Sequence, residues 1–452
     1  MKKVQILPLA AFAIMSMASC SDDDSNSANN GNQPGQVTAE ANIEEAGDYN
    51  FSSNAKQIQL NGTSATSDDT TVTTNEGSKI TITQAGTYHV SGNLTDGQLV
   101  VDADQEDRVQ IILDNVSIAS SGSAAIDIKN ADKVVINVKA GTTNTIADRN
   151  GNNQDSAIFS RTKLSIFGTG TLNVNGNDNA AISSQGGIIL KESTFNFTAN
   201  EDAVKTDHNI IVYSGSLNID ADGDGFNAEE DITINNGTIN ITQSEDGFDA
   251  SAVNILDGNI RIVAKEDGIS VDGEHTNAST ELIVRDGYLY INAGGNGFDA
   301  DGSITIEDGT VIIDGPTSND NVAVSYSSNF NINGGYFIAV NGSSNIDAPS
   351  NSSAQNSVLV KFDATQSANT LVHLQTTLGA NITTFRPSKS FKTLLVSSAS
   401  ISDNGSFQLY TGGTVTGDVL DGLYDFISYV GGALQATFTV SGSVTTVNTT
   451  QS

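Results

Sequence analysis

The chain has 452 residues, with 53 acidic and 20 basic side chains, and its formal net charge is −33. Such a surface repels nucleic acid and anionic membranes, so we exclude a nucleic-acid partner. One cysteine, Cys20, excludes an intramolecular disulfide and a cysteine-based zinc cluster. Tryptophan is absent, while Gly, Asn, Asp, Thr, Ile and Val are abundant, which favours short strands joined by tight turns over helices.

The N-terminus is predicted to be a processing signal. Residues 1–19 hold two lysines and an apolar run too short to span a bilayer comfortably, as in a signal peptide. Small residues before Cys20 resemble a bacterial lipoprotein signal, in which this cysteine is lipidated. The acidic run 21–24 resembles an export signal, and residues 20–37 have the composition of a flexible, acidic and polar tether. We expect an outer-membrane lipoprotein, anchored in the membrane by its lipid and exposed on the cell surface.

An internal repeat decides the predicted fold. A turn residue recurs at spacings of 22, 22, 21, 29, 22 and 26 residues, at Ser193, Gly215, Gly237, Gly258, Gly287, Gly309 and Gly335. Large apolar residues fill 27 of the 28 positions five and three before and two and four after it, the exception being Ala339. This alternation predicts two short half-buried strands, and the constant columns predict coils that stack on one another. A β-hairpin meander would need no such columns.

A third strand follows in each coil, eleven residues after the turn, at Val204, Phe226, Phe248, Ile269 and Phe298. The sequence therefore predicts an all-β right-handed parallel β-helix over residues 38–345, with about 22 residues per coil. Residues 273–280 are predicted to be an inserted loop. Residues 346–452 are predicted to form the last coils and a small β-rich cap that shields the open end of the core.

Acidic residues form a column beside the third strand. Asp202, Asp224, Asp246, Asp267 and Asn296 stand nine residues after the turn, and Lys205, Asn227, Asp249, Ser270 and Asp299 stand twelve after. Equivalent residues of a parallel solenoid stack about 4.8 Å apart, so the carboxylates repel one another. Backbone N–H groups of the turn would relieve this repulsion, and so would bound Ca²⁺. Both interpretations stay open, and Ca²⁺ is the expected cofactor.

One stretch matches the start of a calcium loop. Asp220, Asp222, Asp224 and Gly225 have the D-x-D-x-D-G spacing, with Asp231 where a glutamate would close the loop. The flanking segments are predicted strands, so this is not an EF-hand. The predicted metal ligands are accordingly Asp202, Asp220, Asp222, Asp224, Asn227, Asp246, Asp249, Asp267 and Asp299.

The chain resembles a family of secreted parallel β-helix proteins that bind carbohydrate, over roughly residues 57–440. The resemblance rests on 80–88 (ITITQAGTY), 112–118 (ILDNVSI), 157–160 (AIFS), the repeated Asp-Gly-Phe-Asp coils and 385–391 (FRPSKSF). The family is similar in fold to pectate lyases and is associated with polygalacturonate and calcium. The resemblance implies binding of an acidic plant polysaccharide, without identifying the residues that touch the sugar.

Binding, catalysis and a purely structural role are all compatible with these features. The candidate glycan-binding residues are Lys205, Arg261, Arg285, Tyr288 and Tyr290. A polysaccharide lyase would need a base beside Ca²⁺, for which Lys205 is the best candidate, although pairing with Asp202 or Asp224 would also explain it. An adhesin or surface spacer would need no site at all. We expect a monomeric, calcium-dependent and non-catalytic binder of acidic polysaccharide.

Overall fold

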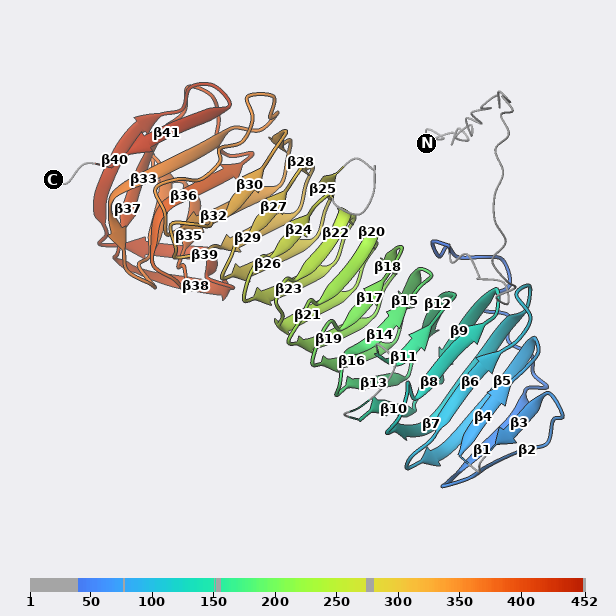
Figure 1. Ribbon diagram of the computed structural model, residues 1–452. Helices are drawn as coiled ribbons and strands as arrows, with labels where there is room; N and C mark the ends of the chain where they lie inside the picture. The colour runs from blue at the N-terminus through green and yellow to red at the C-terminus, as the bar shows by residue number, and fades with distance from the viewer. Residues whose placement is uncertain (1–39, 76–77, 150, 152–155, 274–279, 450–452) are drawn as a thin grey trace, which may run out of the picture. The chain divides into compact units, whose positions relative to one another are not determined.

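A computed structural model describes residues 40–75, 78–149, 151, 156–273 and 280–449. The described residues contain strands and no helix, and they form a β-solenoid of about ten turns (Figure 1). No described segment forms a helix of the length and hydropathy that a membrane span requires. The predicted parallel β-helix is therefore confirmed. The signal peptide and Cys20 lie outside the described residues, as does most of the inserted loop at 274–279.

The solenoid has three faces, which we name by what lies on each. The first coils contain β1 (Lys56–Gly62), β2 (Ala65–Ser67), β3 (Val72–Asn75), β4 (Lys79–Ile82), β5 (Gly86–Leu94), β6 (Gln98–Asp102) and β7 (Arg108–Ser120). The aspartate face continues with β8 (Ile126–Asn130), β11 (Ser156–Ser160), β14 (Ala180–Ser184), β17 (Val204–Thr206), β20 (Phe226–Ile234), β22 (Phe248–Ile255), β24 (Ile269–Val271), β27 (Phe298–Ala300) and β30 (Val324–Tyr326).

The other two faces stack in the same way. The strap face contains β9 (Lys133–Val138), β12 (Lys163–Gly168), β15 (Ile188–Lys191), β18 (Ile210–Val212), the second halves of β20 and β22, β25 (Glu281–Val284), β28 (Ser303–Ile306) and β31 (Phe330–Ile332). The cap face contains β10 (Thr143–Asp148), β13 (Thr171–Gly176), β16 (Thr194–Ala199), β19 (Ser216–Ala221), β21 (Thr238–Gln243), β23 (Asn259–Ala264), β26 (Tyr288–Ala293), β29 (Thr310–Asp314) and β32 (Tyr336–Asn341).

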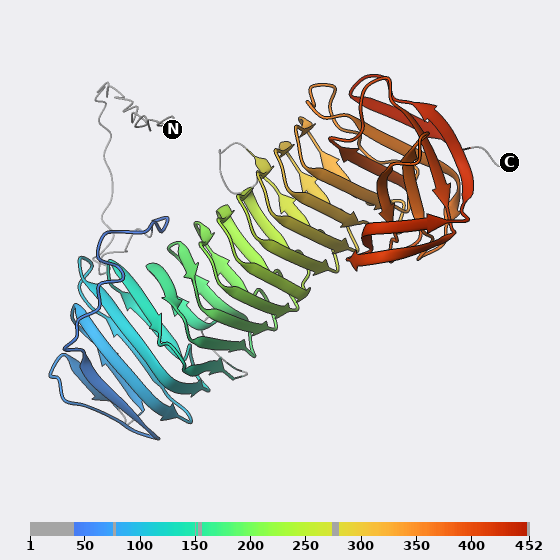
Figure 2. The same cartoon turned by 180° about the vertical axis from the view of Figure 1, so that it is seen from behind.

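Stacked apolar columns form the core. All 28 column positions of the sequence repeat are buried in one continuous cluster. The third strand adds its aromatic column, in which the rings of Phe226 and Phe248 stack with centroids 5.2 Å apart. Gly237 shows why the turn residue recurs, because its φ of +127° disfavours any residue with a side chain. Figure 2 shows the same coil-by-coil stacking from behind.

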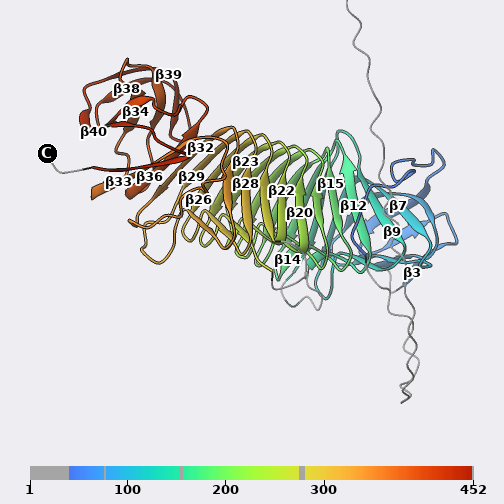
Figure 3. The same ribbon diagram turned by 90° about the horizontal axis from the view of Figure 1, so that it is seen from above.

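The C-terminal region closes the solenoid and also folds back along it. The long strands β33 (Ser357–Gln366) and β36 (Phe391–Ser398) pair antiparallel to each other, β36 also pairs with β32, and β41 (Val444–Asn448) pairs with β33. A second sheet contains β34 (Val372–Thr376), β35 (Asn381–Phe385), β37 (Ser406–Thr411), β38 (Thr414–Leu420), β39 (Leu423–Val430) and β40 (Ala433–Thr439). This cap sheet, drawn in red tones in Figure 3, shares a second apolar core with Ile312 and Ile338 of the cap face.

Residues 40–51 form a strap along the strap face. Asn42 donates its side-chain N–H to the carbonyl of Leu164, and its backbone N–H bonds to the side chain of Asn209. Arg108, Lys133 and Lys163 stand in register on consecutive coils and would repel one another. The acidic residues of the strap neutralise this basic column, so the segment that precedes the solenoid is part of its packing.

Candidate functional site

The aspartate column forms a ladder of side-chain-to-backbone hydrogen bonds. Each Oδ1 accepts the backbone N–H of the equivalent residue one coil on, from Asp202 to Asp224 (2.9 Å), to Asp246 (2.9 Å), to Asp267 (2.6 Å), to Asn296 (2.5 Å) and then to Val322 (2.7 Å). The turn amides that the sequence offered as one explanation are therefore real. They satisfy one oxygen of each carboxylate, and the second oxygen needs another partner.

The second oxygens meet different partners along the ladder. The Oδ2 of Asp202 lies 3.5 Å from the Nζ of Lys205, and the Oδ2 of Asp224 accepts a bond from Asn227. Among the described residues, no donor lies within hydrogen-bond distance of the Oδ2 of Asp246 or Asp267. The middle of the ladder thus presents carboxylate oxygens with unused acceptor capacity.

Burial and crowding raise the pKa values of these carboxyl groups. Removal from water is the largest cause at each position, and the charges of neighbouring aspartates add to it. The pKa of Asp246 rises to about 8, and those of Asp224 and Asp267 rise to about 6. Asp249 is among the like charges that act on all three groups, and Asp299 acts on Asp267. Binding of a proton or a cation would reduce the repulsion between these carboxylates.

The calcium-loop spacing does not produce a calcium loop. Asp220 is exposed on β19, whereas Asp222 pairs with Lys265 at 3.3 Å and accepts a bond from Gln243. Asp231 lies at the far side of β20 and accepts a bond from Thr233. Asp222, Asp224 and Gly225 lie in the bend between β19 and β20, whereas Asp220 and Asp231 lie within the strands on either side. Within the described ranges, no three His, Cys, Asp or Glu side chains are grouped to hold a metal ion.

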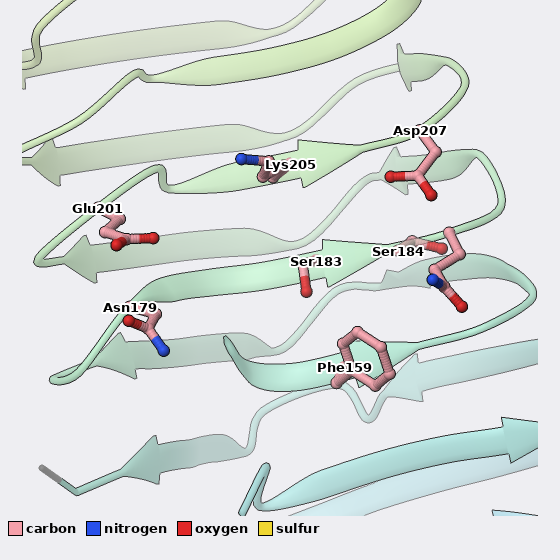
Figure 4. A pocket seen from close by; sticks show the side chains of 8 residues that line it. Phe159, Asn179, Ser183, Ser184, Glu201, Lys205 and Asp207 are labelled. Atoms are coloured by element: carbon pink, nitrogen blue, oxygen red, sulfur yellow. The ribbon is translucent and has the colours of Figure 1, made fainter. Parts of the chain in front are cut away.

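A pocket opens on the aspartate face beside the start of the ladder (Figure 4). It has a volume of about 340 Å³ and is lined by Phe159, Asn179, Ser183, Ser184, Gln185, Glu201, Lys205 and Asp207. The register places Phe159, Ser183 and Lys205 on consecutive strands β11, β14 and β17. The guanidinium of Arg161 lies 6.0 Å from the Phe159 ring centroid. Lys205, half-exposed, therefore faces a hydroxyl- and amide-rich hollow.

The predicted arginine and tyrosine cluster is real, but it is not an open solvated face. Arg261 and Tyr290 are in register on neighbouring coils, as the repeat predicts. The cap folds over them: the Nε of Arg261 lies 2.9 Å from Asp421, and the hydroxyl of Tyr288 donates to the same carboxylate at 2.7 Å. Burial raises the pKa of Tyr290 to about 12.

Arg285 lies apart from this cluster. Its guanidinium pairs with Glu307 one coil on, at 2.8 Å. Asp421 could not be identified from the sequence, because it belongs to the non-repeating region.

A family model described as carbohydrate-binding domain-containing protein matches residues 76–252 and 227–364. A protein of the same description from Acetivibrio thermocellus is 34% identical over 120 residues, which are 25% of this chain and 42% of that protein. The match thus spans less than half of the relative.

A solved structure was also found, described as a polysaccharide lyase-like protein from C. thermocellum in a gadolinium derivative. It is 24% identical, has a TM-score of 0.46, and covers 56% of this chain and 96% of that chain. The two family matches overlap and together run from residue 76 to residue 364, which includes the whole aspartate ladder and the pocket beside it. The chain belongs to the family of carbohydrate-binding domain-containing proteins.

Proposed function

We propose that the aspartate face binds an acidic, pectin-like polysaccharide through calcium, without cleaving it. The observation that carries this proposal is the ladder, whose crowded carboxylates have raised pKa values and unused oxygens next to a pocket. Carboxylate oxygens suit Ca²⁺, which takes six to eight oxygen ligands. The described protein groups do not supply a full set by themselves. Uronate carboxylates of the glycan would complete it.

The residues that fit the ion lie in the middle of the aspartate ladder. Asp246 and Asp249 would hold it with Asn227 at one level, and Asp267 with Asp299 at the next. The ion would supply the positive charge that two anionic partners need between them. Asp246 and its neighbours hold the site in register, because their Oδ1 atoms are fixed by backbone N–H groups. The bound ion would therefore offset the repulsion between the anionic protein and the anionic glycan.

Lys205 provides a direct contact for a uronate at the start of the aspartate ladder. Its amine is half-exposed in the pocket and is paired loosely with Asp202. The amine is therefore placed to donate hydrogen bonds to a uronate carboxylate that enters the pocket. We propose further that lipidation at Cys20 holds the protein on the outer membrane. Loss of radiolabelled palmitate in Cys20→Ser would support the anchor, and unchanged labelling would exclude it.

The Lys205→Glu variant is expected to weaken binding of oligogalacturonate about tenfold, because it replaces an attractive contact with a repulsive one. Titration calorimetry of the full chain with oligogalacturonate in calcium measures this effect. Lys265→Glu is the matched control, since both lysines are about half-exposed and each pairs with one aspartate. Equal losses in both variants would show only a change in net charge and would exclude the pocket as the contact.

A further inference from the structure

A second hollow lies where the cap meets the cap face. It has a volume of about 720 Å³, within the usual range of ligand sites. One wall is a column of the solenoid, with Tyr288, Thr310 and Tyr336 in register on β26, β29 and β32. The hairpin of β38 and β39 forms the opposite wall, and β35 contributes Asn381, Ile382 and Thr383. The hairpin and β35 lie beyond residue 364, where the family match ends.

The walls of this cap groove are fixed in place before any ligand arrives. Asp421, at the turn of the hairpin, accepts bonds from Arg261 and Tyr288 of the solenoid. The hydroxyl of Tyr336 bonds to Thr383 of β35. These contacts tie the hairpin and β35 to the solenoid from both sides of the groove. A preformed groove loses little conformational entropy when it binds, which favours affinity.

The open surface of the groove mixes apolar and acceptor groups. Val419 is 54% exposed and Leu420 is 49% exposed at the end of β38. Asp418 and Asp425 are exposed and stand directly opposite each other across the hairpin. Like charges in that position destabilise a hairpin, so the arrangement calls for a ligand that donates hydrogen bonds to both. A sugar ring offers an apolar C–H face and a rim of hydroxyl donors.

The charges around the groove select among ligand classes. The aromatic faces are not open to a cationic ligand, because Arg261 lies 5.0 Å from the ring centroid of Tyr288 and Arg386 lies 5.5 Å from that of Tyr424. Such a ligand would have only Asp418 and Asp425 to hold it. An anionic uronate would need a cation, but Arg261 is neutralised by Asp421, Arg386 does not line the groove, and the charged residues that do line it are Asp418 and Asp425. We propose that the cap groove is a second glycan site, which takes an uncharged saccharide independently of calcium and of the aspartate face.

The test is titration calorimetry of the full chain in EGTA with hexasaccharides of different charge. The probes are N-acetylchitohexaose, xylohexaose and mannohexaose, which are neutral, with chitosan hexamer as the cation and hexagalacturonate as the anion. We expect binding of at least one neutral probe and none of the charged ones. Preference for chitosan hexamer would make the groove a cation site, and failure of all three neutral probes would overturn the proposal.

Variants locate the binding. Leu420→Asp is expected to weaken binding of the neutral probe at least tenfold, and so is the double variant Asp418→Asn with Asp425→Asn, which removes both opposed charges from the hairpin. Leu378→Asp is the control, because Leu378 is 96% exposed in the loop between β34 and β35 and does not line the groove. Binding that survives both groove variants would overturn the assignment. Calcium-dependent binding of polygalacturonate, measured on the same variants in calcium, should stay unchanged, so the two sites can be confirmed or excluded separately.

Discussion

Replacing Asp48 with alanine is expected to destabilise the docked strap by about 3–5 kcal/mol, because it leaves a buried lysine without its counter-ion. The Nζ of Lys133 lies 2.7 Å from the Oδ2 of Asp48, and both side chains are fully buried. Lys133 also donates to the carbonyl of Ile43. The Nε of Arg108 lies 3.2 Å from the other oxygen of Asp48, close enough for an ion pair although not aligned as a hydrogen bond.

The strap can leave the solenoid without unfolding it. The loss of stability must therefore be measured at the strap itself. Once the strap detaches, water solvates Lys133, so the free-energy cost of its missing counter-ion cannot exceed the cost of detaching the strap. We therefore expect amide exchange to accelerate first at the strap, where the N–H of Glu45 bonds to Asp48, and only later in the coils. Hydrogen exchange read by mass spectrometry measures both.

Two further variants make the test specific. Glu307→Ala removes the partner of Arg285 in an exposed pair and should cost no more than about 1 kcal/mol. The double variant Asp48→Leu with Lys133→Met removes both buried charges together and should recover most of the strap protection. Normal exchange in Asp48→Ala would contradict the assignment of the buried pair as the main fixing point of the strap.

The second large effect concerns the aspartate ladder and pH. Between the ordinary carboxyl pKa of 3.8 and the raised value of about 8, folded Asp246 keeps a proton that the unfolded chain has lost. The folded state then binds more protons, so stability falls as pH rises through this window. We expect the thermal midpoint of the calcium-free protein to rise as pH is lowered from 9 to 5, with Asp224 and Asp267 contributing in the same direction.

Calcium and one substitution distinguish the effect of the ladder carboxylates on stability from the effect of the other charged groups. Calcium should raise the midpoint most at pH 8–9, where the carboxylates are ionised, and its binding near pH 7 should release protons. Asp246→Asn keeps the size and the acceptor oxygen of the side chain but cannot ionise. The thermal midpoint of this variant should therefore depend less on pH. Asp257→Asn, at an exposed turn, is the control. A midpoint that is flat or falls between pH 9 and pH 5 would contradict the raised pKa values.

The repeat explains why the solenoid was predictable from the sequence. A position such as Ile239 has the same role as Leu217 one coil earlier, so periodicity alone fixed its burial, its strand and its register. The aspartate ladder followed from the same registry. The sequence left Asp202 and Asp224 open as partners of Lys205, and the structure places Asp202, three positions earlier in the chain, beside its amine.

Contacts without a period could not be predicted. Asp48 meets Lys133 across 85 residues, and Asp421 meets Arg261 across 160, with no repeat to signal either pair. The cap was predicted to shield the end of the core, yet its second sheet also covers the side of the last coils. The calcium-loop spacing was predicted to lie between strands, and Asp220 does lie on β19 with Asp222 directly after it. Calcium binding at this spacing stays a prediction.

The measurement that tests the central claim most directly is sedimentation of the full chain with insoluble polygalacturonate, in calcium and in EGTA, while the absorbance of unsaturated uronides is followed. We expect binding in calcium, loss of binding in EGTA, and no rise in absorbance. A rise in absorbance would identify a lyase and return Lys205 to the role of base. No binding in either buffer would contradict the account and leave a structural adhesin or spacer as the better description.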